Sequence, residues 1–155
     1  MSIIITTGKK YADIDALACI VADNELLSFD GKKATNYIPG VLNQSVSKTV
    51  LTWPFEYVTE IGAKDENQFI VMDVSDPEHI APGVNHEQVI EVYDHHHGFE
   101  QYWKDKIGEK AVIEMIGAAA TLIWEEFINR GHAENISTTS ANFLYTGIIS
   151  NTLNF

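Results

Sequence analysis

The chain has 155 residues, a length that suits one sizeable hydrophobic core and is short for two domains. Its composition is ordinary for a globular protein, with 45% hydrophobic and 21% charged residues. The 22 acidic and 10 basic residues give a net charge of −12, and the basic residues are scattered. Because such a surface repels nucleic acid, we expect no nucleic-acid partner. Phosphate substrates remain compatible with this charge if divalent cations lie between carboxylates and phosphate oxygens.

Two features of the sequence predict a cytoplasmic protein. Cys19 is the only cysteine, so it cannot form an intramolecular disulfide, which fits a reducing compartment. The N-terminal run MSIIITTGKK has too few apolar residues for a signal peptide or a membrane span. We therefore expect a soluble protein without a membrane partner.

Strand-like and helix-like segments alternate from the N-terminus onward. Ser2–Thr7 is a β-branched run, typical of a strand buried on both faces. Apolar residues then recur at helical spacing over Ile14–Leu27. A second strand is predicted at Ala34–Ile38, where Pro39-Gly40 marks a turn.

The second half of the chain continues this alternation. The predicted strands are Gln68–Val74, Gln88–Tyr93 and Ala111–Met115, and the predicted helices are Gly117–Arg130 and Ser137–Ile149. Alternating strands and helices are typical of α/β proteins. We therefore predict one α/β domain, a three-layer sandwich with a mainly parallel sheet of about five strands and helices on both faces.

Acidic and histidine residues follow three of the predicted strands. Asp13 and Asp15 come after the first strand, Asp73 closes the third, and Asp94-His95-His96 follows the fourth. In an open parallel sheet, ligands bind outside the carboxyl ends of the strands. Oxygen and imidazole ligands at one edge suit Mn²⁺ or Mg²⁺, and the absence of thiolates argues against structural zinc.

Some of these residues also have a plain structural explanation. Asp13 and Asp15 can cap a helix and place negative charge in its first turn. Asp73 can simply end a strand at a turn. Asp94-His95-His96 is harder to explain by packing, because three metal-competent residues directly follow an apolar strand. Three further histidines lie in predicted loops, and we expect them at the surface: His79, His86 and His132.

Four segments occur in the order of the motifs of DHH phosphoesterases, a family that the sequence resembles. They are Gly8–Asp15 (GKKYADID), Val71-Met72-Asp73, Tyr93–His96 (YDHH) and Gly147–Leu153 (GIISNTL). The small-residue run Ile116–Thr121 is similar to the family segment that opens the helix between the third and fourth motifs. The spacing resembles the branch of manganese-dependent inorganic pyrophosphatases and exopolyphosphatases more than the exonuclease branch. The resemblance covers residues 1–155 as the N-terminal, metal-binding domain of the usual two.

The resemblance implies a site for two Mn²⁺ or Mg²⁺ ions, bridged by Asp73. The implied metal ligands are Asp13, Asp15, Asp73, His95 and Asn151, and the implied catalytic residues are Asp94 and His96. Cations about 3.5–4 Å apart in such sites lower the pKa of a bridging water, which then attacks phosphorus. The implied activity is hydrolysis of phosphoanhydride bonds in pyrophosphate, polyphosphate or another small phosphorylated substrate.

Two positions depart from the family pattern. Lys9 stands where the family often has a metal-binding histidine, and a protonated ammonium cannot bind a cation. Asn151 stands where the family usually has an aspartate, and it offers a neutral and weaker ligand. We expect the Lys9 ammonium to reach the carboxylates of Asp13 and Asp73, and the site to hold one cation or none.

These departures leave two functions open. The first is the phosphohydrolase; the alternative is a catalytically degenerate domain that binds a metal or a phosphorylated ligand in a regulatory role. In the family the substrate-binding basic residues lie in a C-terminal domain, which residues 1–155 do not include. We therefore expect the isolated chain to hydrolyse pyrophosphate poorly. The family also implies a homodimer.

Overall fold

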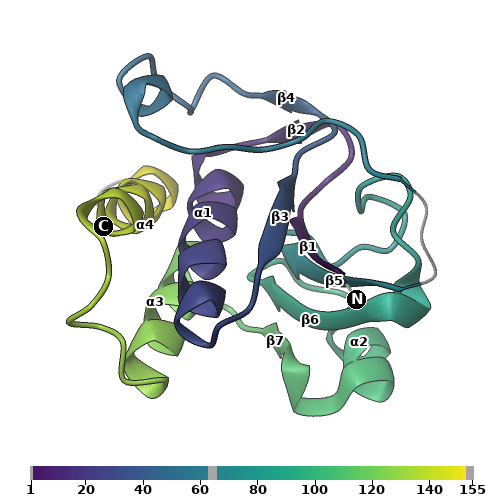
Figure 1. Ribbon diagram of the computed structural model, residues 1–155. Coiled ribbons are helices and arrows are strands. Elements are labelled where there is room, and N and C mark those ends of the chain that lie inside the picture. The colour runs from purple at the N-terminus through teal and green to yellow at the C-terminus, as the bar shows by residue number, and fades with distance from the viewer. Residues whose placement is uncertain (1, 63–65, 153–155) are drawn as a thin grey trace.

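Residues 2–62 and 66–152 are described by the computed structural model, whose main sheet has five parallel strands (Figure 1). Its spatial order is β3-β1-β5-β6-β7. The strands are β1 (Ser2–Thr6), β3 (Ala34–Tyr37), β5 (Asn67–Met72), β6 (Val89–Asp94) and β7 (Ala111–Ile113). The predicted parallel sheet of about five strands is confirmed.

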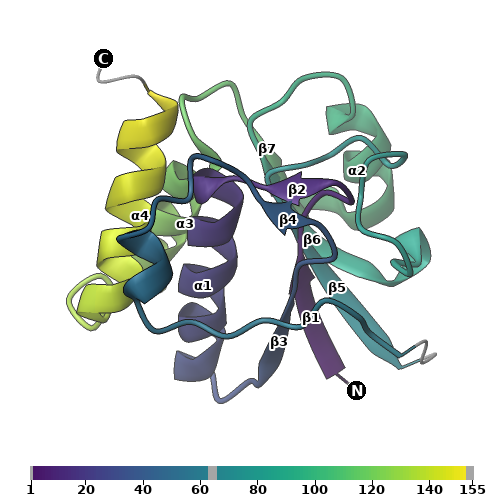
Figure 2. The same cartoon turned by 90° about the horizontal axis from the view of Figure 1, so that it is seen from above.

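Helices cover both faces of this sheet (Figures 1 and 2). On one face, α1 (Ile14–Phe29) and α3 (Ala119–Asn129) pack against the strands, and α4 (Thr138–Asn151) packs mainly against α1. On the other face, α2 (Glu100–Ile107) lies beside β6 and β7. The predicted three-layer sandwich is therefore confirmed. Within the described residues, no helix has the length and apolar character needed to cross a membrane.

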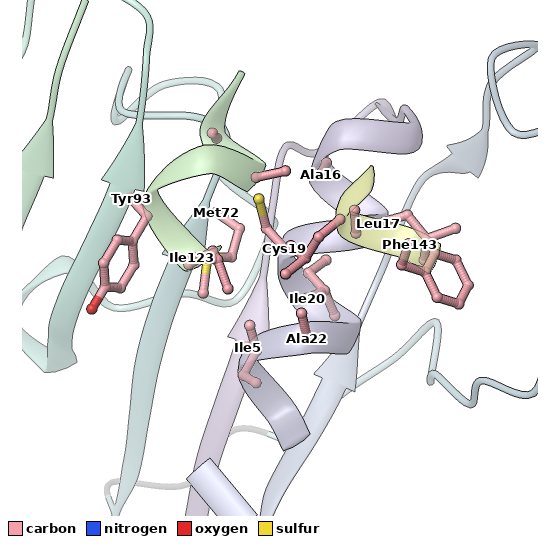
Figure 3. Close-up of a cluster of buried hydrophobic side chains, with 14 of the residues drawn as sticks. Ile5, Ala16, Leu17, Cys19, Ile20, Ala22, Met72, Tyr93, Ile123 and Phe143 are labelled. Atoms are coloured by element: carbon pink, nitrogen blue, oxygen red, sulfur yellow. The ribbon is translucent and has the colours of Figure 1, made fainter. Parts of the chain in front are cut away.

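Alternation of side chains along the strands gives the sheet a separate core on each face. In Figure 3, α1 side chains such as Leu17 and Cys19 lie between Met72 of β5 and Phe143 of α4. On the opposite face, Trp103 of α2 is fully buried, and its Nε1 donates to the carbonyl oxygen of Ser75 at 2.6 Å. The sequence did not predict α2, because Trp103 is its only fully buried residue among charged and polar neighbours.

A second, small sheet joins β2 (Tyr11–Ala12) to β4 (Val41–Leu42). Strands of two residues leave no periodic pattern, so the sequence did not predict them. Gly40, directly before β4, lets the backbone pass close to Lys10, directly before β2. A Cβ at residue 40 would lie 2.4 Å from the carbonyl carbon of Lys10. Three short 3-10 helices complete the elements, at Val50–Thr52, His86–Gln88 and Gly108–Lys110.

The order of the strands identifies the edge of the sheet where a ligand would bind. Counted along the chain, the five strands of the main sheet lie in the order 2-1-3-4-5, so the winding direction reverses between β1 and β5. Ligands of open α/β sheets bind outside the carboxyl ends of the strands at such a reversal. Asp73 directly follows β5, and Asp13 follows β1 after the short β2.

Candidate metal centre

A cleft of about 500 Å³ opens at the carboxyl ends of β1 and β5. Its charged and imidazole side chains are those of Lys9, Lys10, Asp13, Asp73, Asp76, His79, His96 and His97. Acidic groups and cation-forming groups therefore share one cavity in a chain whose net charge is −12. A volume of this size is typical of small-molecule sites.

Asp73 has an unusual backbone conformation that fixes its side chain in the cleft. Its φ is 57°, and it is the only residue other than glycine in the described ranges with a positive φ. Aspartate tolerates this left-handed region better than most residues, at a cost of about 1–3 kcal/mol. The backbone N–H of Asp73 donates to the carbonyl of Tyr93 at 2.8 Å, which holds the turn in place. Burial raises the pKa of the Asp73 carboxyl to about 7.

His95 presents a free ring nitrogen to Asp73. Its Nδ1 lies 3.1 Å from the carbonyl oxygen of Ile116, which can only accept a hydrogen bond. Nδ1 therefore carries the hydrogen, and neutral His95 has its lone pair on Nε2, the arrangement found in metal-bound histidines. Nε2 lies 3.2 Å from Oδ1 of Asp73 and 3.7 Å from Oδ2 of Asp15. Without a cation, the Asp73 carboxylate raises the pKa of His95 to about 9, so Nε2 carries a proton that a bound cation would replace.

The atoms that face each other in this pair fit a divalent cation. Asp73 Oδ1 and His95 Nε2 are both buried, and neither takes part in an aligned hydrogen bond with a described residue. Buried polar atoms without partners are rare in folded proteins, because each costs about 1–3 kcal/mol. Together with a ring nitrogen of His96, their ligand atoms lie within 4.8 Å of one another. A cation between them would satisfy both atoms, and a carboxylate–imidazole set without thiolates is compatible with Mn²⁺.

His96 is oriented by the buried carboxylate of Asp94. Oδ1 of Asp94 accepts hydrogen bonds from the backbone N–H of His95 at 2.8 Å and of His96 at 3.2 Å. The same oxygen lies 2.7 Å from Nδ1 of His96 and raises the pKa of this imidazole. The His96 side chain is 62% exposed, so an oriented ring faces the cleft beside Asp73.

Asp15 joins three helices at the back of the site. Its fully buried carboxylate accepts hydrogen bonds from the backbone N–H groups of Ala119 and Ala120, each at 2.8 Å. These are the first residues of α3, whose N-cap, Ala118, has no side-chain oxygen to offer. Asn151 at the end of α4 donates from Nδ2 to Oδ2 of Asp15 at 2.7 Å. The capping group that α3 lacks is therefore supplied by α1.

Lys9 does not point where the sequence predicted. Its ammonium donates to the carbonyl oxygen of Glu78, and among the described residues it forms no ion pair with Asp13 or Asp73. The expectation that it reaches both carboxylates is therefore wrong. The physical reason is the backbone: the N–H of Lys9 pairs with the carbonyl of His79 at 2.9 Å, and the side chain follows that loop. Asp13 caps α1 instead, since its Oδ1 accepts from the N–H of Ala16 at 2.9 Å.

The structure brings the sequence-predicted site residues to one edge of the sheet. Direct contacts link Asp15, Asp73, Asp94, His95, His96 and Asn151, and Asp13 lines the same cleft. The sequence analysis missed the backbone groups that orient them, the carbonyl of Ile116 and the N–H groups of α3. The small-residue run Ile116–Thr121 was the only signal for these groups, because backbone atoms carry no residue type. Leu153, the last residue of the fourth motif, lies outside the described residues.

The histidines expected at the surface are of two kinds. His79 is exposed, but it lines the cleft, and its Nδ1 lies 3.1 Å from a carboxylate oxygen of Asp76. His86 and His132 are half-buried, which corrects the expectation: their rings pack on Trp103 and on Phe29.

Comparison with solved structures identifies proteins of the same architecture. An exopolyphosphatase-related protein from Bacteroides fragilis superposes with a TM-score of 0.66 and 16% identity, over 99% of this chain and 47% of its own. A Methanococcus jannaschii protein assigned to the family II inorganic pyrophosphatases gives a TM-score of 0.61 and 17% identity, over 97% of this chain and 49% of its own. The fold is shared.

At these identities the likeness concerns the fold, and the chain spans about half the length of each of the two proteins. No family model matches the sequence, and no curated protein matches it.

Proposed function

We propose that the chain is a metal-dependent phosphohydrolase that cleaves phosphoanhydride bonds in the cleft at the ends of β1 and β5. The observation that carries this proposal is that Asp73 Oδ1 and His95 Nε2, two buried ligand atoms, face each other at 3.2 Å without an aligned hydrogen bond to any described residue. The pair lies at the edge of the sheet where α/β proteins bind ligands. The names of the two proteins with this fold support the choice of substrate class, which is pyrophosphate, polyphosphate or another small phosphorylated molecule. We propose further that the chain is the metal-binding half of a DHH phosphoesterase.

In this proposal the protein side chains hold the cation, bind phosphate and hold a proton. Asp73 and His95 are the proposed ligands of a Mn²⁺ or Mg²⁺ ion. When bound, such an ion neutralises phosphoryl oxygens and lowers the pKa of a bound water. Asp94 accepts the hydrogen on Nδ1 of His96 and raises the pKa of the ring, so in the protonated ring the second hydrogen, on Nε2, is left to contact a phosphate oxygen or to protonate the leaving phosphate.

Cation-forming side chains on the cleft wall suit an anionic substrate. Lys9 and Lys10 line the cleft together with His79. In a chain with a net charge of −12, cation-forming residues that line the same cavity as three aspartates lower the local repulsion of phosphate. The carboxylates and the cation-forming residues of the cleft therefore have separate proposed partners, the cation and the phosphate.

The proposed function is tested by measuring phosphate release from three substrates in the presence of Mn²⁺. Pyrophosphate, a linear polyphosphate and a dinucleotide are each incubated with the chain in excess, so that slow turnover is visible. We expect release from pyrophosphate or polyphosphate that stops when the metal is chelated, and no cleavage of the dinucleotide. Cleavage of the dinucleotide alone, or release that persists in chelator, would contradict the proposal.

A second candidate function is a degenerate domain that binds a metal or a phosphorylated ligand without turnover. It is favoured by Asn151, which donates a hydrogen bond to Asp15, and by Lys9, a residue of the cleft lining that offers no metal ligand. The phosphate-release assay, combined with Mn²⁺ titration, separates the two functions. Tight Mn²⁺ binding without phosphate release from any of the three substrates would select this second function.

A further inference from the structure

We infer that the chain holds one divalent cation, between Asp73 and His95, and that the neighbouring Asp15 is satisfied by the amide of Asn151 and by backbone N–H groups instead of serving as a metal ligand. The inference rests on the proposed metal-dependent function and specifies how many ions the site takes. It follows from which ligand atoms are free and which are already engaged in hydrogen bonds.

Both oxygens of Asp15 are engaged within the protein. Oδ1 accepts from the N–H of Ala120, and Oδ2 accepts from the N–H of Ala119 and from Asn151. The carboxylate is fully buried at the N-terminus of α3, where the helix dipole favours a negative charge. If Asp15 turned away to bind a cation, three donors would lose their acceptor in a buried place. Asp15 therefore has a structural role: its carboxylate holds the start of α3 and the end of α4 next to the site.

Asn151 makes this arrangement independent of metal. Its Nδ2 lies 2.7 Å from Oδ2 of Asp15. With an aspartate at position 151, two carboxylate oxygens would face each other at this distance, and only a cation or a proton between them would relieve the repulsion. The amide donates a hydrogen to the same oxygen, so the pair is stable without an ion.

The side of the site formed by Asp13 and Lys9 also lacks a complete set of ligands for a second cation. Asp13 uses Oδ1 to cap α1, and Lys9, whose ammonium donates to the carbonyl oxygen of Glu78, is among the residues that line the same cleft. A cation placed there would have carboxylate oxygens as its only protein ligands and a positive charge on the same wall. Asp73 Oδ1 and His95 Nε2 remain as the position in the described site where two buried ligand atoms without an aligned hydrogen bond meet.

The inference is tested by Mn²⁺ titration of the wild type, Asn151→Asp and Asn129→Asp. Asn129 is a matched control, because it is also the last residue of a helix, is exposed and lies outside the cleft. Calorimetry gives the number of ions, and the electron paramagnetic resonance signal separates an isolated Mn²⁺ from an exchange-coupled pair. For the wild type and Asn129→Asp we expect one isolated Mn²⁺ per chain.

For Asn151→Asp we expect a metal-free melting temperature about 3–6 °C below that of Asn129→Asp, and recovery when Mn²⁺ is added. For the double variant Lys9→His, Asn151→Asp, which restores a ligand on each side, we expect two ions and a coupled signal. Two ions with a coupled signal in the wild type, or equal melting temperatures for Asn151→Asp and Asn129→Asp, would overturn the inference.

These outcomes are separable from failure of the proposed function. Two ions in the wild type together with phosphate release would overturn the single-ion inference and leave the phosphohydrolase in place. One ion without phosphate release from any substrate would overturn the phosphohydrolase and leave the single-ion inference in place. No bound Mn²⁺ at all would overturn both.

Discussion

His95 and His97 are two residues apart and provide a direct test of which imidazole binds the metal. His95 Nε2 is buried and faces Asp73, whereas His97 is exposed and its Nδ1 lies 2.8 Å from a carboxylate oxygen of Glu100. We expect His95→Ala to weaken Mn²⁺ binding at least about tenfold, roughly 1.4 kcal/mol, because a ligand is lost. His97→Ala should change the affinity less than about twofold. Calorimetric titration of both folded variants measures this, and equal losses would refute the assignment.

Asp23 is a buried carboxyl far from the cleft, and it makes stability depend on pH. Neither of its oxygens has a hydrogen-bond partner among the described residues. Burial, with a smaller contribution from Glu91, raises its pKa from 3.8 to about 7. Between these values the folded chain binds a proton that the unfolded chain does not, so stability falls as pH rises from about 4 to about 7.

Replacement of Asp23 by asparagine should remove this pH dependence. Three pKa units correspond to at most about 4 kcal/mol, so Asp23→Asn should melt several degrees above the wild type at pH 8, with a clearly smaller difference at pH 5. Asp105→Asn on α2 is the exposed control. Melting curves at both pH values measure the effect, and the same loss of stability from pH 5 to pH 8 in Asp23→Asn and in the wild type would contradict it.

Individual site residues were predictable where they follow strands. Asp73 and the run Asp94-His95-His96 could be assigned to one edge because parallel strands end together there. The direction of the Lys9 side chain could not, because it depends on the pairing of the Lys9 backbone with His79, far along the chain. The hydrogen bonds that Asp15 accepts from α3 could not be predicted either, since the donors are backbone N–H groups.

At the scale of elements, the crossing of α1 and α4 brings Asn151 within reach of Asp15. Gly147 is buried at this crossing, and a Cβ there would lie 3.1 Å from the Cβ of Ala18 and 3.4 Å from the Cα of Asp15. We expect Gly147→Val to destabilise the fold by about 1–3 kcal/mol, because the larger side chain overpacks the crossing. Helix propensity alone would favour valine over glycine, so the loss would come from packing.

The matched control for Gly147→Val is Asn142→Val, which places the same side chain on the exposed face of α4. Chemical denaturation of both variants gives the free energies of unfolding. A Gly147→Val chain as stable as Asn142→Val would show that the two helices do not need to approach so closely.

The elements themselves were predictable to different degrees. The five strands of the main sheet and helices α1, α3 and α4 follow clear apolar patterns, and their types are confirmed. The start of α3 was placed two residues early, at Gly117, because its true cap comes from Asp15 in another helix. The helix α2 was missed, since it packs through Trp103 and has little other apolar surface.

At the scale of the whole molecule, the mainly parallel sheet of about five strands and the helices on both of its faces could be predicted, because alternating strands and helices allow few other arrangements. The second domain, the homodimer and the cytoplasmic location stay predictions from the family resemblance and the composition. The cleft itself could not have been predicted in detail, because its walls come from loops that only the folded sheet brings together.

The most direct test of the phosphohydrolase assignment is Mn²⁺-dependent phosphate release from pyrophosphate or polyphosphate by the wild type and Asp73→Asn, with the chain in excess. Asparagine keeps the shape of the side chain and tolerates the positive φ of residue 73, so the variant should fold but lose the charge that binds the cation. Asp105→Asn is the control for removal of an exposed acid. We predict slow, metal-dependent release by the wild type and the control, and release at least about a hundredfold lower, near 2.7 kcal/mol, by Asp73→Asn. Undiminished release by a folded Asp73→Asn chain would contradict the account.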